Sequence, residues 1–305
     1  MMSRRRCAAQ QTSRVPAPSP LVCLPLLTLP FPVRWVSLRQ CMHTIYHMLE
    51  ESGDALLDDP AGTLADAFEA CNVHLRLMVC EPEIEVNALE SGTCAVVAFL
   101  HLRELFVASV GDCRCILGTR TEEGDLAVIQ LSTDHKVDLP GEKARIEEKG
   151  GYVRPGRVDT ENDEFIPARL YEVEGKPWLG PGLCVSRSLG DLNALRCGLI
   201  PTPEVFSHVL RDEDKFIILA SDGVWEFIDN EEAVRIVEVF YRKGLPALDA
   251  CRYLIAKAAV AWRRFEGDYR DDITAIVVYV DMLVENLVAE TLEPVPEANE
   301  GETGA

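Results

Sequence analysis

The chain has 305 residues, of which 48% are hydrophobic and 26% are charged, values typical of a soluble globular protein with a sizeable core. This composition excludes a collagen-like fibre and a fully disordered chain, and no apolar stretch reaches the roughly 18 residues of a membrane helix without proline or charge. Fifty acidic against 30 basic residues give a net charge of −20, which disfavours nucleic acid and anionic membranes as partners.

The charge is distributed unevenly along the chain. Residues 1–49 hold six arginines and no Asp, Glu or Lys, so residues 1–35 are interpreted as an atypical Arg/Pro-rich N-terminal segment. This segment is either unstructured or misassigned sequence, or a targeting signal such as an organellar transit peptide. Eleven scattered cysteines without a CxxC pair indicate buried, reduced thiols. We therefore expect a cytoplasmic or nuclear protein, with an organellar location as the alternative.

The first regular elements lie between residues 63 and 150. Thr63 and Asp66 form a capping-box pattern that opens a helix. Its apolar residues recur at helical spacing: Leu64, Ala67, Phe68, Cys71, Leu75 and Met78. Two β-rich runs, 94–100 and 105–110, predict an antiparallel hairpin, with a third strand around 127–131. Pro140–Lys149 predicts a short helix that ends at a Gly-Gly pair.

The second half alternates a long irregular stretch with regular elements. Residues 154–182 are rich in Gly, Pro and charge and predict a surface excursion. The later elements are expected in this order: a strand at Phe216–Ala220, a helix capped by Asp229, a helix from Leu248 to Arg264, and a strand at Ile273–Val280. The acidic tail at 283–305 should be disordered. Clusters of antiparallel strands with a helix pair predict an α+β layered domain.

Three aspartates share one local design, in which an apolar strand ends or starts at a carboxylate beside a turn. They are Asp112, Asp222 and Asp271. Strands of one sheet bring their ends close together, and gathered carboxylates repel one another unless protons or cations intervene. All-oxygen ligands of this kind suit Mg²⁺ or Mn²⁺. Each aspartate taken singly is also explained as an ordinary turn residue.

Longer sequence motifs are more specific than the pattern of these three aspartates. Seven blocks run in order over residues 91–280: SGTCAVVAFL, LFVASVGDCRCILG, LSTDHKVDLPGEKARIEEKGGYV, GLCVSRSLGD, GLIPTPEV, FIILASDGVWEFIDNEEAV and DDITAIVVYV. This ordered set resembles the metal-dependent protein phosphatase family (PPM, protein phosphatase type 2C). The resemblance places a phosphatase domain, in partial form, at residues 36–282.

The resemblance implies a fold, an activity and a cofactor. The expected fold is a four-layer α-β-β-α sandwich of two antiparallel sheets flanked by helices, incomplete at its N-terminus. The expected activity is hydrolysis of phosphoserine and phosphothreonine in protein substrates. Two divalent metals, Mg²⁺ or Mn²⁺, activate a water in the family, so the reaction needs no nucleophilic side chain. The resemblance gives no oligomeric state and no substrate protein.

The site residues carried over from the family are metal ligands. Asp222 in Ser-Asp-Gly and Asp271 at the start of the last core strand match ligating aspartates, and Asp112 in Gly-Asp-Cys-Arg matches the ligand of a weaker additional metal. Asp272 stands where the family often has Asn, and Cys113 replaces the usual Ser. His135 and Lys136 lie in a family loop and are expected to organise structure. Residues 150–182 correspond to the variable flap beside the cleft.

The departure from the family lies at the N-terminus. The early Arg/Asp block and the Asp-Gly-His-Gly block, whose Asp bridges the two metals, are both absent, and no Asp precedes Asp54. Val36–Glu50 resembles the helix after Asp-Gly-His-Gly, so the bridging aspartate is expected near residues 20–34. Two explanations stay open. The N-terminal sequence is wrong and the protein is an ordinary phosphatase, or the chain is a pseudophosphatase that binds phosphoproteins.

Overall fold

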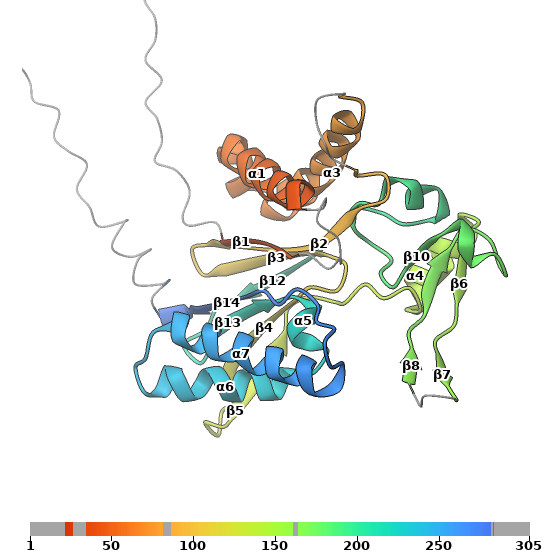
Figure 1. Cartoon of the computed structure of the whole chain (residues 1–305). Coiled ribbons are helices and arrows are strands. Elements are labelled where there is room, and N and C mark those ends of the chain that lie inside the picture. The colour runs from red at the N-terminus through yellow and green to blue at the C-terminus, as the bar shows by residue number, and fades with distance from the viewer. Residues whose placement is uncertain (1–21, 27–34, 82–86, 161–163, 282, 284–305) are drawn as a thin grey trace, which may run out of the picture.

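The computed structural model describes residues 22–26, 35–81, 87–160, 164–281 and 283. Two antiparallel sheets lie face to face, with one group of helices on each outer side (Figure 1). This is the four-layer α-β-β-α sandwich expected from the sequence, and a smaller unit of short strands extends from one end. In the part of the chain described, no helix has the length and apolar character needed to span a membrane.

The first sheet is built around the predicted hairpin. Its main path runs β1 (Val22–Leu26), β2 (Gly92–His101), β3 (Glu104–Val110) and β12 (Glu204–Val209), and the short β11 (Leu189–Gly190) also pairs with β2. The hairpin register joins Ala95 to Val110 and His101 to Glu104, which confirms the predicted pairing of 94–100 with 105–110. Among the residues of the proline-rich N-terminal segment that the structure describes, Val22–Leu26 form a strand, β1, beside β2.

The second sheet has the order β14 (Ala275–Tyr279), β13 (Phe216–Ala220), β4 (Arg114–Arg120) and β5 (Leu126–Gln130). The strand predicted around 127–131 exists as β5, but it pairs with β4 and not with the hairpin. The chain crosses from one sheet to the other at Gly111–Cys113, between β3 and β4. Antiparallel pairing throughout both sheets agrees with the short connections and separate strand clusters seen in the sequence.

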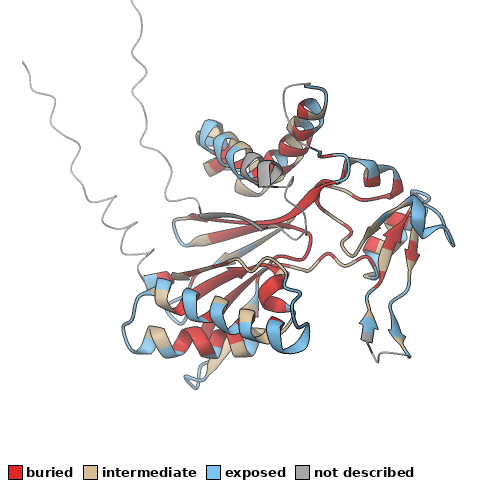
Figure 2. Cartoon of the chain, in the orientation of Figure 1, coloured by how far each residue is buried: buried red, intermediate tan, exposed pale blue. Residues whose placement is uncertain are grey.

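Side chains alternate between three apolar layers. On β13, Ile217 and Leu219 face the other sheet, whereas Phe216 and Ile218 face the helices α6 (Asn230–Arg242) and α7 (Ala247–Phe265). The opposite outer layer lies between the first sheet and two long helices, α1 (Trp35–Ser52) and α3 (Pro60–Val79), linked by α2 (Asp54–Asp58). Both sheets are therefore buried on two faces (Figure 2), which explains their continuous apolar runs.

The helix predicted from Thr63 begins one turn earlier than the capping-box pattern indicates. α3 starts at Pro60, and the carboxylate of Asp59 caps it by accepting a hydrogen bond from Gly62 N at 3.0 Å. The Thr63 hydroxyl instead donates to the carbonyl of Ala55 at 3.0 Å. Proline at the first helical position after an aspartate cap is a stronger start signal than a Thr-x-x-Asp pattern. The predicted apolar face is confirmed at all six positions.

The segment after residue 139 forms a small α/β unit beside the sandwich. α4 (Pro140–Glu148) packs beside a three-stranded sheet of β10 (Pro181–Leu183), β9 (Arg169–Tyr171) and β6 (Tyr152–Arg154). A two-stranded ribbon, β7 (Arg157–Asp159) and β8 (Glu164–Ile166), projects from it (Figure 1). Two 3-10 helices, Pro177–Leu179 and Leu192–Cys197, flank β10 and β11. We call residues 150–182 the flap.

Candidate metal and phosphate site

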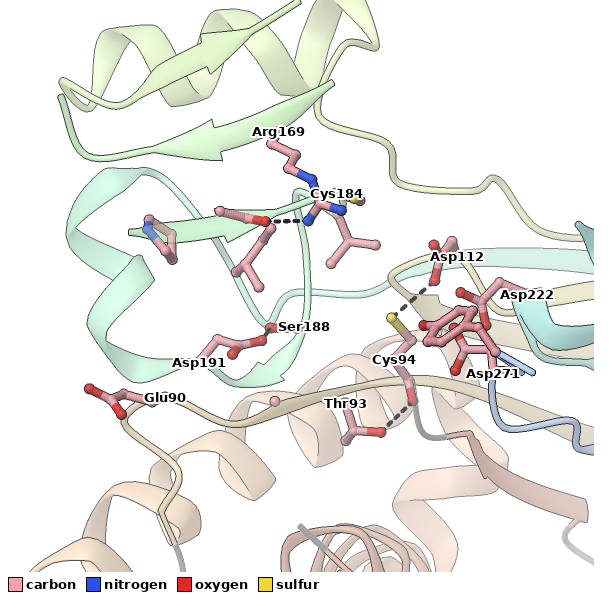
Figure 3. A pocket seen from close by; sticks show the side chains of 16 residues that line it. Glu90, Thr93, Cys94, Asp112, Arg169, Cys184, Ser188, Asp191, Asp222 and Asp271 are labelled. Atoms are coloured by element: carbon pink, nitrogen blue, oxygen red, sulfur yellow. Dashed lines mark hydrogen bonds between the residues drawn. The ribbon is translucent and has the colours of Figure 1, made fainter. Parts of the chain in front are cut away.

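Strand register brings the three predicted aspartates to one end of the sandwich. Ala220, the last residue of β13, pairs with Arg114 on β4 and with Ala275 on β14. Asp112 precedes β4 by two residues, Asp222 follows β13 by two, and Asp271 lies four residues before β14. All three line one pocket of about 400 Å³, and their side chains gather on one wall of it (Figure 3).

Glycines next to two of the aspartates make this convergence possible. Gly111 has φ +83°, and a Cβ there would lie 2.1 Å from the Cys94 sulfur. A Cβ on Gly223 would lie 2.3 Å from the carbonyl oxygen of Asp272, because the turn after β13 touches the segment before β14. The Ser221 hydroxyl donates to that same carbonyl at 2.9 Å. Gly-Asp and Ser-Asp-Gly are therefore steric requirements for bringing the three segments together.

Gly223→Ala is expected to destabilise the protein by about 1–3 kcal/mol, because the new methyl group meets backbone atoms that must move. The same shift separates the Asp222 turn from the segment that carries Asp271. Urea unfolding of the metal-free protein measures the loss. Gly141→Ala is the matched control: nothing lies within 4 Å of its Cβ, so its stability should be unchanged or higher. Equal stability of the two variants would contradict the close contact.

Asp222 has the least compensated charge of the three. Its Oδ1 atom is buried and has no hydrogen-bond partner among the described residues. Burial raises the pKa of Asp222 well above the ordinary range, and the nearby carboxylates of Asp112 and Asp271 raise it further. Lys136 opposes this effect and does not overcome it. A buried carboxylate oxygen without a donor, beside two like charges, is a position that a cation would stabilise.

Asp271 shows a weaker form of the same behaviour. Its pKa is raised by burial and by the carboxylates of Asp272 and Asp112, although the backbone N–H of Asp272 donates to Asp271 Oδ1 at 2.7 Å. The pKa values of Asp222 and Asp271 are raised for the same reason: several carboxylates lie close together in a pocket that is partly shielded from water. Perturbed carboxyl groups of this kind cluster at functional sites.

Asp112 has a protein counter-ion that the sequence did not reveal. Lys136 Nζ lies 2.5 Å from Asp112 Oδ2, and the Cys94 thiol donates to Asp112 Oδ1 at 3.2 Å. Burial alone would lower the pKa of Lys136, but the surrounding carboxylates, Asp112 foremost, raise it overall. The ammonium therefore stays charged. Lys136 was expected to organise structure, and here it directly neutralises a predicted metal ligand.

His135 has the structural role expected from its loop. It is buried, its backbone N–H donates to the carbonyl of Gly111 at 2.8 Å, and its Nδ1 lies 3.1 Å from the same oxygen. Burial is the main reason that its pKa is lowered, and the Arg187 guanidinium acts in the same direction. A neutral ring then donates its Nδ1 proton to Gly111. His135 thus fixes the turn that presents Asp112.

Behind the pocket, a buried ion network holds the segment that leads from the flap into the sandwich. Glu142 on α4 is 2.7 Å from Arg187 Nη2 and 2.8 Å from Arg145 Nη2, and it accepts from the Ser186 hydroxyl at 2.5 Å. Arg145 Nη2 also donates to the Ser186 carbonyl at 2.9 Å. The network connects α4 to the segment before Ser188, which lines the pocket.

The donor chemistry of the pocket fits a divalent cation. Asp112, Asp222 and Asp271 offer carboxylate oxygens, the ligand type that Mg²⁺ and Mn²⁺ prefer, and the unpartnered Asp222 oxygen is available to a cation. Within the described ranges, no three His, Cys, Asp or Glu side chains are grouped closely enough to hold a metal ion between them. The fit therefore concerns the type and charge of the ligands, and Asp222 and Asp271 are the residues that would hold the ion.

Comparisons with known proteins identify the family of the chain. The family model described as Protein phosphatase 2C matches residues 36–261. Among curated proteins, "Probable protein phosphatase 2C 12" of Oryza sativa subsp. japonica is 36% identical over 226 residues, covering 74% of this chain and 54% of the relative. "Probable protein phosphatase 2C 72" of Arabidopsis thaliana is 33% identical, covering 70% of this chain and 61% of the relative. The chain thus spans about half to three fifths of these two relatives.

Solved structures share the fold. A serine-threonine phosphatase 2C from Toxoplasma gondii superimposes with a TM-score of 0.61 at 19% identity, covering 86% of this chain and 99% of that one. A C. elegans sex determining protein gives a TM-score of 0.55 at 18% identity, covering 80% of this chain and 53% of that one. At these identities the likeness concerns the fold alone.

Proposed function

The chain belongs to the protein phosphatase 2C family, whose model matches residues 36–261, and we propose that it is a protein serine/threonine phosphatase that hydrolyses phosphoserine and phosphothreonine with a metal-activated water. The cofactor proposed is Mg²⁺ or Mn²⁺, with two ions per site as in the family. The observation that carries the proposal is the convergence of Asp112, Asp222 and Asp271 at one pocket, with one buried oxygen of Asp222 left unpartnered.

The chain's own residues support this function by placing negative charge where cations are needed. Asp222 and Asp271 present oxygens that repel each other in the absence of a cation, so they favour its binding. Gly111 and Gly223 allow their segments to approach, and Lys136 balances Asp112. When bound, a divalent cation lowers the pKa of a coordinated water and neutralises charge on the phosphoryl oxygens.

The alternative is a catalytically impaired pseudophosphatase that binds phosphoproteins or regulates other proteins on the same fold. One observation favours it: within the described residues, no group of three ligand-type side chains is assembled for a metal ion. In this form the pocket and the flap would bind a phosphorylated segment without releasing phosphate. The two functions share the fold and the pocket, and they differ in whether turnover occurs.

The test is release of phosphate from a phosphothreonine peptide by the purified chain, with Mn²⁺ and with a chelator. The proposed function expects release that requires Mn²⁺ and that persists in Asp66→Asn, a control at an exposed position on α3. A folded protein that binds the peptide and releases no phosphate at saturating Mn²⁺ would refute the phosphatase and support the pseudophosphatase.

A further inference from the structure

We propose that Arg169, on β9 of the flap, is the residue that binds the phosphate group of the substrate. This inference rests on the proposed function for the identity of the ligand, a phosphorylated serine or threonine side chain. It depends on where one guanidinium lies in a strongly acidic pocket, so its test has a binding readout that does not require turnover.

The acidic lining of the pocket would repel a phosphate group unless positive charge offsets the repulsion. Its lining contains five carboxylates, and Arg169 is the one lysine or arginine among the described residues that line it. The carboxylates are Glu90, Asp112, Asp191, Asp222 and Asp271. A phosphate monoester carries a charge of about −1.5 to −2 at neutral pH, so it is repelled by these side chains. Cations bound at the aspartates would offset part of that repulsion, and Arg169 supplies positive charge from the flap side of the pocket (Figure 3).

The guanidinium of Arg169 is held in place by one hydrogen bond, and its other N–H groups can donate to a ligand. Its Nη1 donates to the carbonyl of Gly182 on β10 at 2.7 Å, which anchors one edge of the group. Over the described ranges it has no salt bridge with a carboxylate. A guanidinium has five N–H donors in a planar fork that matches two phosphate oxygens. Arg169 is therefore held in place by the flap, and no described carboxylate forms a salt bridge with its guanidinium.

The neighbouring cations are already engaged elsewhere. Lys136 is paired with Asp112 at 2.5 Å and does not line the pocket. Arg187 and Arg145 are held by Glu142. The guanidinium of Arg154, which pairs with Arg169 across the flap sheet, lies over the Tyr171 ring at 5.2 Å. Of the residues that the structure describes around the pocket, Arg169 is therefore the cation available to an entering anion.

The flap thus contributes a charged side chain to the pocket in addition to forming part of its wall. β9 and β10 place one arginine on the flap side of the pocket that Asp112, Asp222 and Asp271 also line, so a phosphorylated side chain bound there would contact the guanidinium and any cation held by the aspartates. Replacing the charge should weaken binding of the phosphate and not of the peptide that carries it. A purely structural role, in which Arg169 only braces β10 through Gly182, would instead affect both peptides or only the stability.

The experiment measures binding of matched phosphorylated and unphosphorylated threonine peptides by calorimetry, with turnover measured in parallel at saturating Mn²⁺. The proteins are wild type, Arg169→Gln, Arg169→Lys and the control Arg196→Gln. Arg196 is also near the flap, but it is exposed and paired with Glu172 at 2.7 Å. Arg169→Gln should weaken phosphopeptide binding about ten- to a hundredfold, the range for a lost charged hydrogen bond. It should raise KM more than it lowers kcat.

Arg169→Lys keeps the charge without the fork and should give an intermediate loss, whereas Arg196→Gln should bind as wild type. The inference is overturned if Arg169→Gln and wild type bind the phosphopeptide equally, if both peptides lose affinity in parallel, or if wild type does not prefer the phosphorylated peptide. Should Arg169→Gln fail to fold, the Arg169→Lys comparison decides alone. A wild type that binds selectively but shows no turnover refutes the phosphatase and leaves the role of Arg169 standing.

Discussion

Asp222→Asn is expected to lower Mn²⁺-dependent phosphatase turnover by about a hundredfold or more, because it removes the carboxylate that we propose as a direct metal ligand. Loss of a residue that only supports a ligand usually costs about ten- to a hundredfold. The variant is nearly isosteric, so packing around the turn after β13 should be preserved. Ser221, Gly223 and their contacts to Asp272 do not involve the side chain of residue 222. Steady-state kinetics against Mn²⁺ concentration measure the loss.

The same substitution should make the metal-free protein more stable. Asp222 has a raised pKa in the folded state, caused first by burial and then by Asp112 and Asp271. At low pH the carboxyl group is protonated in both the folded and the unfolded state, so its raised pKa does not change the free energy of unfolding. Once the pH rises above the ordinary aspartate value of about 4, the raised pKa destabilises the folded state. Asp222→Asn should therefore melt higher than wild type at neutral pH, and the difference should vanish in acid.

Opposite effects on activity and stability separate a functional residue from a structural one. Asp66→Asn, on the exposed side of α3, should change neither property. If Asp222→Asn lowers both activity and metal-free stability, the loss of activity reflects damage to the fold. If it leaves turnover unchanged, Asp222 is not a metal ligand of the reaction.

Glu142→Gln should produce the largest loss of stability, about 3 kcal/mol, at the lower end of the range for breaking a buried ion pair. Glu142 is only 7% exposed, and its carboxylate is shared by Arg187, Arg145 and the Ser186 hydroxyl. Its removal leaves two guanidinium groups without their common partner. Urea unfolding at neutral pH measures the change.

The pH dependence of this effect has a defined sign. Burial alone raises the pKa of Glu142, but hydrogen bonds from Arg187, Arg145 and Ser186 lower it strongly overall. A lowered carboxyl pKa contributes stability above the ordinary glutamate value of about 4.3, and that stability is lost as the pH falls further. The gap between wild type and Glu142→Gln should therefore be full at pH 7 and close in acid.

Glu147→Gln on the same helix is the matched control. Glu147 is exposed and lies 3.7 Å from Lys143, so its loss should cost less than about 1 kcal/mol. A cost for Glu142→Gln no larger than that of Glu147→Gln would show that the network does not hold the segment before the pocket.

Elements governed by local pattern were predictable from the sequence. The six apolar positions of α3, the hairpin of β2 and β3, and the Asp229 cap of α6 all follow from spacing and capping within a few residues. The proximity of Asp112, Asp222 and Asp271, which line one pocket, was also predictable, because each lies where an apolar strand meets a turn. Antiparallel register then brings such positions to one edge, as the pairing at Ala220 shows.

Features that depend on distant partners were not predictable. A third strand was expected around residues 127–131 without a stated partner, and that strand, β5, pairs with β4 in the second sheet. The sequence does not fix this choice, since both sheets offer apolar strands of similar length. The ion pair between Lys136 and Asp112 joins residues 24 positions apart, and that between Arg187 and Glu142 joins residues 45 apart. Arg169 was one charge among many in a polar stretch. Only the folded flap places it on the wall of the pocket.

Calorimetric titration of Mn²⁺ into metal-free protein tests most directly whether this pocket is a metal site. Wild type, Asp222→Asn and the control Asp66→Asn are compared under identical conditions. We expect saturable binding to wild type and to Asp66→Asn, and binding at least about tenfold weaker to Asp222→Asn, because an oxygen ligand is lost. Equal binding by all three proteins, or no binding by a folded wild type, would contradict the assignment of Asp222 and its neighbours as metal ligands.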